Sequence, residues 1–86
     1  MAQIAYPIIL HGNDQQGYNV TAPDVPGVVV TGKTKLDAQQ KAQYAILTII
    51  GEMNYYPVPS LMSEVKVTAP DLLQLVIVDI KTLNIK

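Results

Sequence analysis

The run from Gly17 to Thr34, GYNVTAPDVPGVVVTGKT, constrains the fold more than any other part of the sequence. It holds two short apolar-rich segments joined by the corner Pro23-Asp24-Val25-Pro26-Gly27. Each proline fixes φ at about −65°, removes an amide donor and favours extended geometry in the residue before it. Gly27 is free to take a positive φ and so to turn the chain back into a strand. The run therefore predicts neighbouring strands at 18–22 and 28–31 with a stiff connection between them.

A long helix is predicted to follow the second of these strands almost at once. Thr34 and Asp37 have the spacing of a capping box, with Asp in place of the commoner Glu. The apolar residues beyond them recur with the period of one helical face, at Ala38, Ala42, Ala45, Ile46, Ile49, Ile50 and Met53. Because the first of these are small alanines, we expect the start of the helix to approach the sheet closely.

The two ends of the chain also read as strands. Residues 3–11 are apolar on both sides, and Pro7 predicts an edge strand or an outward-facing amide, since proline cannot donate to a ladder. The polar segment 12–17 has the length of a hairpin turn. Residues 71–80 again carry two apolar faces. A short helical turn over 61–65, capped by Ser60, is predicted before this last strand.

Together these segments predict an α+β fold in one domain spanning residues 1–86. Its order is β-β-β-α-β, a three-stranded antiparallel meander, one long helix packed on the sheet, and a final strand. One helix covers only one face of a sheet, so the second apolar face of the final strand needs a cover from elsewhere. We therefore predict that Leu73, Leu75 and Ile77 form an oligomer interface.

Composition limits the classes of function. Hydrophobic residues make up 49% of the 86 residues, with no Cys, Trp or Phe, so the core is aliphatic and has no disulfide to reinforce it. A chain this small gains stability by pairing, which favours a dimer and leaves a tetramer open. Six lysines, no arginine and a net charge of −1 suit nucleic acid poorly. With no signal sequence and no apolar run of membrane-spanning length, a cytoplasmic protein is expected.

The residues of chemical interest give no catalytic or metal-ligand pattern. His11 is the single histidine, and Asp14 and Asp24 are the acids near it in sequence, an arrangement typical of a solvent-facing His beside a turn. We expect no cofactor and no metal site. For Asp24 two compatible roles stay open, an Asx-turn with nearby backbone amides or direct contact with a partner.

The chain resembles the HicB antitoxins of HicAB toxin–antitoxin pairs. The resemblance covers about residues 6–53, with a weaker echo in Pro59-Ser60 and the final strand. The residues that carry it are Tyr6-Pro7-Ile8-Ile9, Gly17-Tyr18, the corner Pro23-Asp24-Val25-Pro26-Gly27, Thr31-Gly32 and Thr34 before an Ala-spaced helix. It implies a partial RNase H fold and a non-enzymatic homo-oligomer that blocks a HicA-like mRNA interferase by covering it.

The resemblance also guides the expected site. Partner binding is assigned to the available carboxylates and the corner, namely Asp14, Tyr18, Asp24, Pro26, Gly27 and Glu52. The acids are too scattered for nuclease chemistry, which gathers several carboxylates around metal ions. Many HicB proteins carry a C-terminal DNA-binding segment, and we expect none here and no direct DNA binding. The alternative is an orphan HicB-fold interaction or structural module without a toxin.

Overall fold

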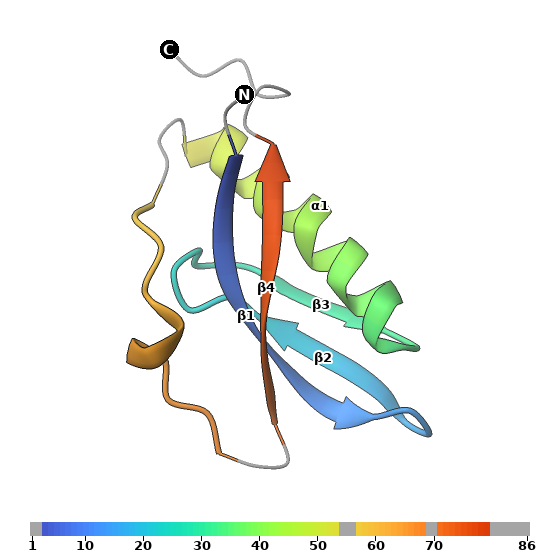
Figure 1. Cartoon of the computed structure of the whole chain (residues 1–86). Helices are drawn as coiled ribbons and strands as arrows, with labels where there is room; N and C mark the ends of the chain where they lie inside the picture. The colour runs from blue at the N-terminus through green and yellow to red at the C-terminus, as the bar shows by residue number, and fades with distance from the viewer. Residues whose placement is uncertain (1–2, 54–56, 69–70, 80–86) are drawn as a thin grey trace.

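The computed structural model describes residues 3–53, 57–68 and 71–79. Its elements follow the predicted order, with one three-residue 3-10 turn before the last strand (Figure 1). They are β1 (Gln3–Asn13), β2 (Gly17–Thr21), β3 (Val29–Gly32), α1 (Lys35–Met53), η1 (Met62–Glu64) and β4 (Leu72–Asp79). The predicted α+β fold is thus confirmed, with the second and third strands each displaced by one residue from the expected bounds.

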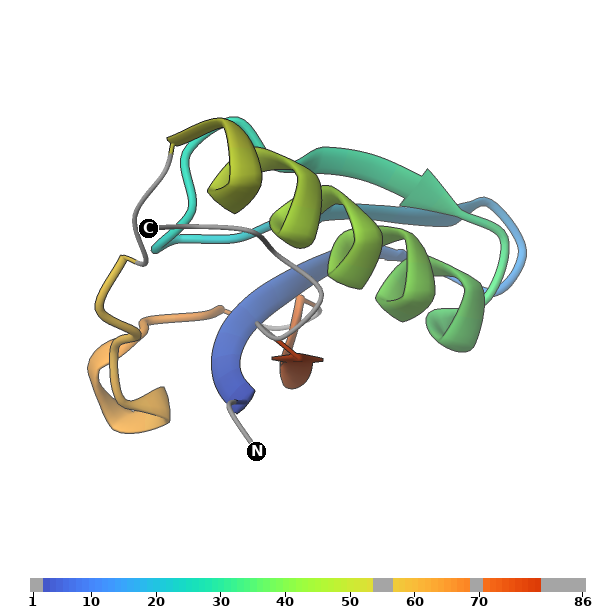
Figure 2. The same ribbon diagram turned by 90° about the horizontal axis from the view of Figure 1, so that it is seen from above.

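The four strands form one antiparallel sheet in the order β3-β2-β1-β4. Helix α1 crosses one face of this sheet, and the segment from Pro57 to Thr68 runs along the side of β1 (Figure 2). Strand β1 lies inside the sheet, so the prediction of an edge strand from Pro7 is wrong. Ile80, the last residue of the predicted fourth strand, and the tail beyond it lie outside the described residues.

Pro7 sits within the sheet at a place where it costs no ladder bond. It pairs with Leu75 of β4, and the pairing of β1 with β2 starts only at Ile9. Two residues along β4, the carbonyl of Ile77 accepts a hydrogen bond from the Gln43 side chain of α1, so it points away from β1. Since backbone directions alternate with a period of two, the Pro7 pair is also one without ladder bonds. The Pro7 nitrogen therefore faces away from β4, which is the second of the two positions predicted for it.

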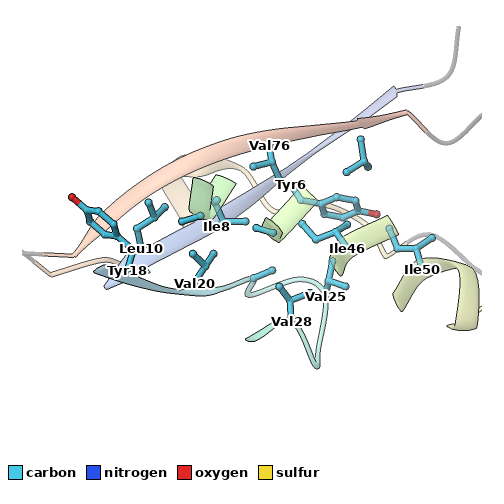
Figure 3. Packing of buried hydrophobic residues seen from close by; sticks show 14 residues of the cluster. Tyr6, Ile8, Leu10, Tyr18, Val20, Val25, Val28, Ile46, Ile50 and Val76 are labelled. Carbon is cyan, nitrogen blue, oxygen red and sulfur yellow. The ribbon is translucent and has the colours of Figure 1, made fainter. Parts of the chain in front are cut away.

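The core lies between α1 and the sheet (Figure 3). Its helical side consists of residues four apart, all fully buried, namely Ala38, Ala42, Ile46 and Ile50. Its sheet side consists mainly of alternate residues of β1, β2 and β4, including Tyr6, Ile8, Leu10, Tyr18, Val20, Val76 and Val78. Within the described parts of the chain, no helix is long and apolar enough to span a bilayer.

The start of α1 lies very close to β3, as the small alanines predict. A Cβ atom placed on Gly32 would stand 2.5 Å from the backbone nitrogen of Ala38. Such a distance is far inside van der Waals contact, so only glycine fits there. The β3-to-α1 junction is therefore fixed by shape, and it sets where the first turn of the helix stands relative to the sheet.

Candidate partner-binding surface

The turn between β1 and β2 is built by its own side chains. The Asn13 Oδ1 atom accepts hydrogen bonds from the backbone nitrogens of Gln15 at 3.0 Å and Gln16 at 2.8 Å. This is an Asx-type turn, in which a side-chain oxygen replaces a backbone acceptor. Asp14 is thereby held at the exposed tip of the hairpin.

Tyr18 fixes the side chain of Asp14 from inside the core. The tyrosine is 4% exposed, and its hydroxyl donates to Asp14 Oδ1 at 2.7 Å. This hydrogen bond, with burial, raises the pKa of Tyr18, because ionisation would place a phenolate against a carboxylate. Tyr18 therefore offers little surface of its own to a partner, and its role at this site is to orient Asp14.

The corner between β2 and β3 is held by a contact that its local sequence does not reveal. Asp24 accepts two hydrogen bonds from Ser60, from its backbone nitrogen to Oδ2 and from its hydroxyl to Oδ1, both 2.7 Å long. The expected Asx-turn with nearby amides is thus wrong, because both oxygens of the carboxylate are turned toward a residue 36 positions away. Pro26 and Gly27 stand exposed at the tip, with Gly27 at a φ of 95°.

The segment that carries Ser60 is anchored a second time, at Tyr6, whose hydroxyl donates to the carbonyl of Pro57 at 2.7 Å. The sequence predicts that Ser60 caps the short helical turn, but in the structure it does not. Instead the Glu64 side chain accepts from the backbone nitrogen of Leu61 at 2.9 Å and caps η1. Ser60 stands one residue before Leu61, the N-cap of η1, and its hydroxyl donates to Asp24.

The predicted partner-binding residues fall into two groups at opposite ends of the domain. Asp14 and Tyr18 lie where β2 begins, and the corner follows the end of β2. The corner packs on the late turns of α1, because a Cβ on Gly27 would lie 3.5 Å from the Ile49 side chain. Exposed Glu52 belongs to these late turns. The structure thus brings Glu52 to the corner end and leaves Asp14 at the hairpin end.

A hollow between β3 and α1 is bordered by residues that the sequence analysis did not include among the partner-binding residues. It has a volume of about 580 Å³ and is bordered by Val29 and Tyr44, each 74% exposed. A second hollow of about 570 Å³ lies at the hairpin turn beside Asp14, and the two share Thr31 and Lys41. In the sequence, the indication of the first hollow was Tyr44, an aromatic residue on the polar face of the helix.

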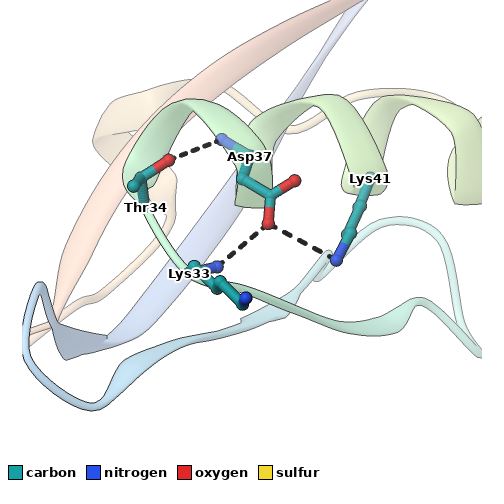
Figure 4. A network of polar contacts seen from close by, with 4 residues as sticks. All are labelled: Lys33, Thr34, Asp37 and Lys41. Atoms are coloured by element: carbon teal, nitrogen blue, oxygen red, sulfur yellow. Dashed lines mark hydrogen bonds and ion pairs between the residues drawn. The ribbon is translucent and has the colours of Figure 1, made fainter.

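The start of α1 carries a compact polar network beside these hollows (Figure 4). Thr34 Oγ1 accepts from the Asp37 backbone nitrogen at 3.1 Å, which confirms the predicted N-cap. Asp37 Oδ2 accepts from the Lys33 backbone nitrogen at 3.0 Å and lies 3.4 Å from Lys41 Nζ. The Lys33 amide, followed by Lys41, lowers the pKa of Asp37. In a standard capping box the Asp37 carboxylate would accept from the backbone nitrogen of the N-cap residue, Thr34. Here it accepts instead from Lys33, one residue before the N-cap.

His11 is paired with an acid that sequence proximity did not indicate. Its Nδ1 atom lies 2.8 Å from Asp71 Oδ2, whereas Asp14 is bound by Tyr18. The pair is partly exposed. Across residues 3–53, 57–68 and 71–79, no group of three His, Cys, Asp or Glu side chains is placed to hold a metal ion.

The predicted oligomer interface lies on the face of β4 turned away from the core. Leu75 and Ile77 are 47% and 54% exposed, while Val76 and Val78 between and beside them are buried. Leu73 is partly buried. The strand therefore has the two apolar faces that its sequence indicates, and α1 covers only one of them.

Comparison with known proteins gives one consistent family. The family described as "HicB_like antitoxin of bacterial toxin-antitoxin system" matches residues 6–85. The crystal structure of the Burkholderia pseudomallei antitoxin HicB superposes with a TM-score of 0.79 at 31% identity, covering 96% of this chain and 69% of that one. The structure of the N-terminal domain of the same antitoxin gives 0.71 at 31% identity, covering 88% and 99%.

A third solved structure shares the fold at lower identity. It is a toxin–antitoxin complex from Streptococcus pneumoniae, with a TM-score of 0.70 at 16% identity, covering 96% of this chain and 74% of that one. At this identity the likeness concerns the fold alone. A search among curated proteins finds no significant match to this sequence.

Proposed function

Because the chain belongs to the HicB-like antitoxin family, we propose that it is the antitoxin of a type II toxin–antitoxin system. It binds a HicA-like mRNA interferase and neutralises it by occlusion, without catalysis of its own. The observation that carries the proposal is the family match over residues 6–85, supported by the superposition on an antitoxin of 31% identity. Its site of action in this proposal is the cytoplasm, and its net charge of −1 with no arginine does not favour direct binding to DNA.

Occlusion needs a rigid surface rather than reactive groups. The domain is built for rigidity at both ends of the proposed contact surface. Buried Tyr18 fixes the hairpin carboxylate of Asp14, and Ser60 fixes the corner through Asp24. Groups held in place before binding lose less conformational entropy when the complex forms, which favours affinity.

The six residues assigned to partner binding take different parts in this proposal. Asp14 at the hairpin, and Pro26, Gly27 and Glu52 at the other end, touch the toxin. Tyr18 and Asp24 act as positioning residues, since one is buried and the other is engaged by Ser60. Exposed carboxylates at the rim of an interface with a basic partner mainly raise the association rate.

The proposal is tested by reading the genes on either side of this one and expressing any small basic protein that they encode, alone and together with this chain. The neighbour alone is expected to arrest growth, and co-expression is expected to restore growth and to yield a complex that co-purifies. A neighbour that neither arrests growth nor binds would leave an orphan HicB-fold interaction module as the better interpretation.

Point variants refine the test. Asp14→Asn and Glu52→Gln are expected to slow association with the toxin, and more so at low salt, because they remove steering charge. Glu64→Gln is the matched control, since a glutamine oxygen still accepts from Leu61 and η1 lies outside the proposed surface. Equal association rates for all three variants would remove the carboxylates from the proposal.

A further inference from the structure

The two edges of the sheet differ in how the rest of the domain protects them. Strand β4 forms one edge, and α1 covers it, because Gln43 donates to the carbonyl of Ile77 and Gln39 bonds to the side chain of Gln74. Strand β3 forms the other edge, and no side chain of the described residues bonds to its backbone. Coverage by a helix is one of the ways in which proteins prevent a sheet edge from pairing. The β3 edge lacks it.

The backbone direction at the β3 edge follows from the position of Pro7. Directions alternate along a strand, so with Pro7 facing away from β4, the pair of Ile9 with Thr21 bonds between β1 and β2. The next pair outward, Val20 with Val30, therefore bonds between β2 and β3. The two neighbours of Val30 in β3 then direct their amide and carbonyl groups to the free edge.

These neighbours, Val29 and Thr31, are well suited to accept a further strand. Strand β3 has the sequence Val-Val-Thr-Gly, with no charged residue and no proline. Charged side chains and proline are the common means of blocking an exposed edge, and neither is present here. The edge therefore offers backbone donors and acceptors, spaced two residues apart, to the backbone of an extended segment.

The hollow of about 580 Å³ between β3 and α1 lies along this edge. Val30 borders it on the strand, and Tyr44 and Ala45 border it on the helix. Tyr44 is 74% exposed, so its ring stands beside the hollow without a cover. Side chains alternate along a strand, so a segment added to β3 directs every second side chain into the hollow. Backbone pairing with a pocket for alternate side chains is a general mode of recognition of extended segments.

Charge indicates which kind of segment fits the hollow. Asp37 and Lys41 border it, and they lie 3.4 Å apart, so each already has a counter-charge. A charged side chain directed into the hollow would find no free opposite charge, and its desolvation would be costly. The fitting segment is therefore extended and carries uncharged side chains on the side that faces α1.

The hollow continues toward the hairpin carboxylate already assigned to the toxin. The second hollow, beside Asp14, shares Thr31 and Lys41 with the first. We propose that the free edge of β3 binds an extended segment of the toxin by strand addition, with its uncharged side chains packed against Tyr44. This inference rests on the proposed function, and it specifies the surface on which the toxin is held.

The first test is amide hydrogen exchange by NMR, on the full chain alone and with a purified HicA-like protein encoded beside this gene. Strand addition is expected to slow exchange at Val29 and Thr31 in the complex at least roughly tenfold. The amide of Val30 serves as the internal control, because it bonds to β2 in both states. Absence of such a gene, or of binding, would overturn the proposed function and this inference with it. Binding that leaves Val29 and Thr31 unprotected would overturn this inference alone.

The second test removes the edge donor. Thr31→Pro deletes an amide that points away from β2, a position at which an edge strand tolerates proline. It is expected to raise the dissociation constant of the toxin complex at least roughly tenfold, and far-ultraviolet circular dichroism checks the fold. Thr31→Val keeps the amide and is the matched control, with an expected change of less than about twofold. Equal affinities of the two variants would exclude strand addition.

The third test concerns the helical wall of the hollow. Tyr44→Ala removes an exposed ring and is expected to weaken toxin binding roughly tenfold, as loss of an aromatic anchor does. Leu36→Ala is the matched control, since Leu36 is 63% exposed on α1 and borders a hollow beside β4 instead. Equal weakening by both variants would contradict the proposal. Protection of Val29 and Thr31 that grows with the concentration of the free chain would show a second copy at this edge and would overturn it too.

Discussion

Asp24 and Ser60 are joined by two hydrogen bonds of 2.7 Å, although they lie 36 positions apart in the sequence. The contact ties the corner between β2 and β3 to the segment that leads from α1 to β4. It gives the proline-rich corner a fixed position, so that Pro26 and Gly27 are presented on a rigid support.

Removal of this contact is expected to destabilise the domain. Asp24→Ala loses both bonds to a charged acceptor and is expected to lower the free energy of unfolding by about 2 kcal/mol. Ser60→Ala keeps the backbone bond and is expected to cost about 1 kcal/mol. Urea denaturation measures both, with Ser63→Ala on the exposed side of η1 as the control. A loss for Asp24→Ala no larger than for the control would contradict the structural role of the pair.

Gly32 and Gly51 are expected to respond to alanine in opposite directions. Gly32→Ala places a methyl group 2.5 Å from the backbone of Ala38 and is expected to cost about 1–3 kcal/mol. Gly51 is exposed inside α1, where alanine is the better helix former, so Gly51→Ala is expected to gain about 0.5–1 kcal/mol. Thermal unfolding of the two variants compares them directly, and a stabilised Gly32→Ala would refute the close approach of β3 and α1.

The cap of α1 is expected to make stability fall in acid. The folded-state pKa of Asp37 is lowered from 3.8, so its contribution is present above 3.8 and is lost as the pH falls through the folded value. Asp37→Asn is therefore expected to be less stable than the wild type near neutral pH and to match it in strong acid. Lys41→Gln is expected to have the smaller effect, because the Lys33 amide is the main cause of the shift. Urea titrations at several pH values decide this, and a pH-independent difference would count against it.

Tyr18 is expected to titrate above its ordinary value of 10.0. Because the folded pKa is raised, the stability that Tyr18 contributes is present below pH 10.0 and is lost as the pH rises through the folded value. The difference in near-ultraviolet absorbance between wild type and Tyr18→Phe isolates this tyrosine from the others. Asp14→Asn is expected to move its pKa back toward 10.0, and an unchanged titration would show that Asp14 is not the cause.

The sequence was informative wherever the interacting residues are close along the chain. The cap of α1 joins Thr34 to a residue three positions on, and the same pattern that predicted it gave the start of the helix. The alternation in β4 likewise predicted one covered and one uncovered face. In both cases the prediction depends only on residues that are close together in the sequence.

The remaining contacts depend on how distant segments meet. His11 pairs with Asp71 and Asp24 with Ser60, and in each case a nearer residue offered a simpler local explanation. Pro7 suggested an edge strand, yet β1 is internal because β2 and β4 pair on its two sides. The proline is tolerated because the pairing with β2 begins beyond it. The hollow beside Tyr44 exists only because α1 lies next to β3. Such features depend on the register of the strands and on the position at which the helix packs on the sheet.

Neutralisation in this proposal works by covering the toxin. The most direct measurement is RNA cleavage by a purified HicA-like protein encoded beside this gene, while the chain is titrated against it. Occlusion predicts a linear loss of cleavage that is complete at a fixed stoichiometric ratio, and RNA incubated with the antitoxin alone is expected to stay intact. Undiminished cleavage in the presence of excess folded protein would contradict it.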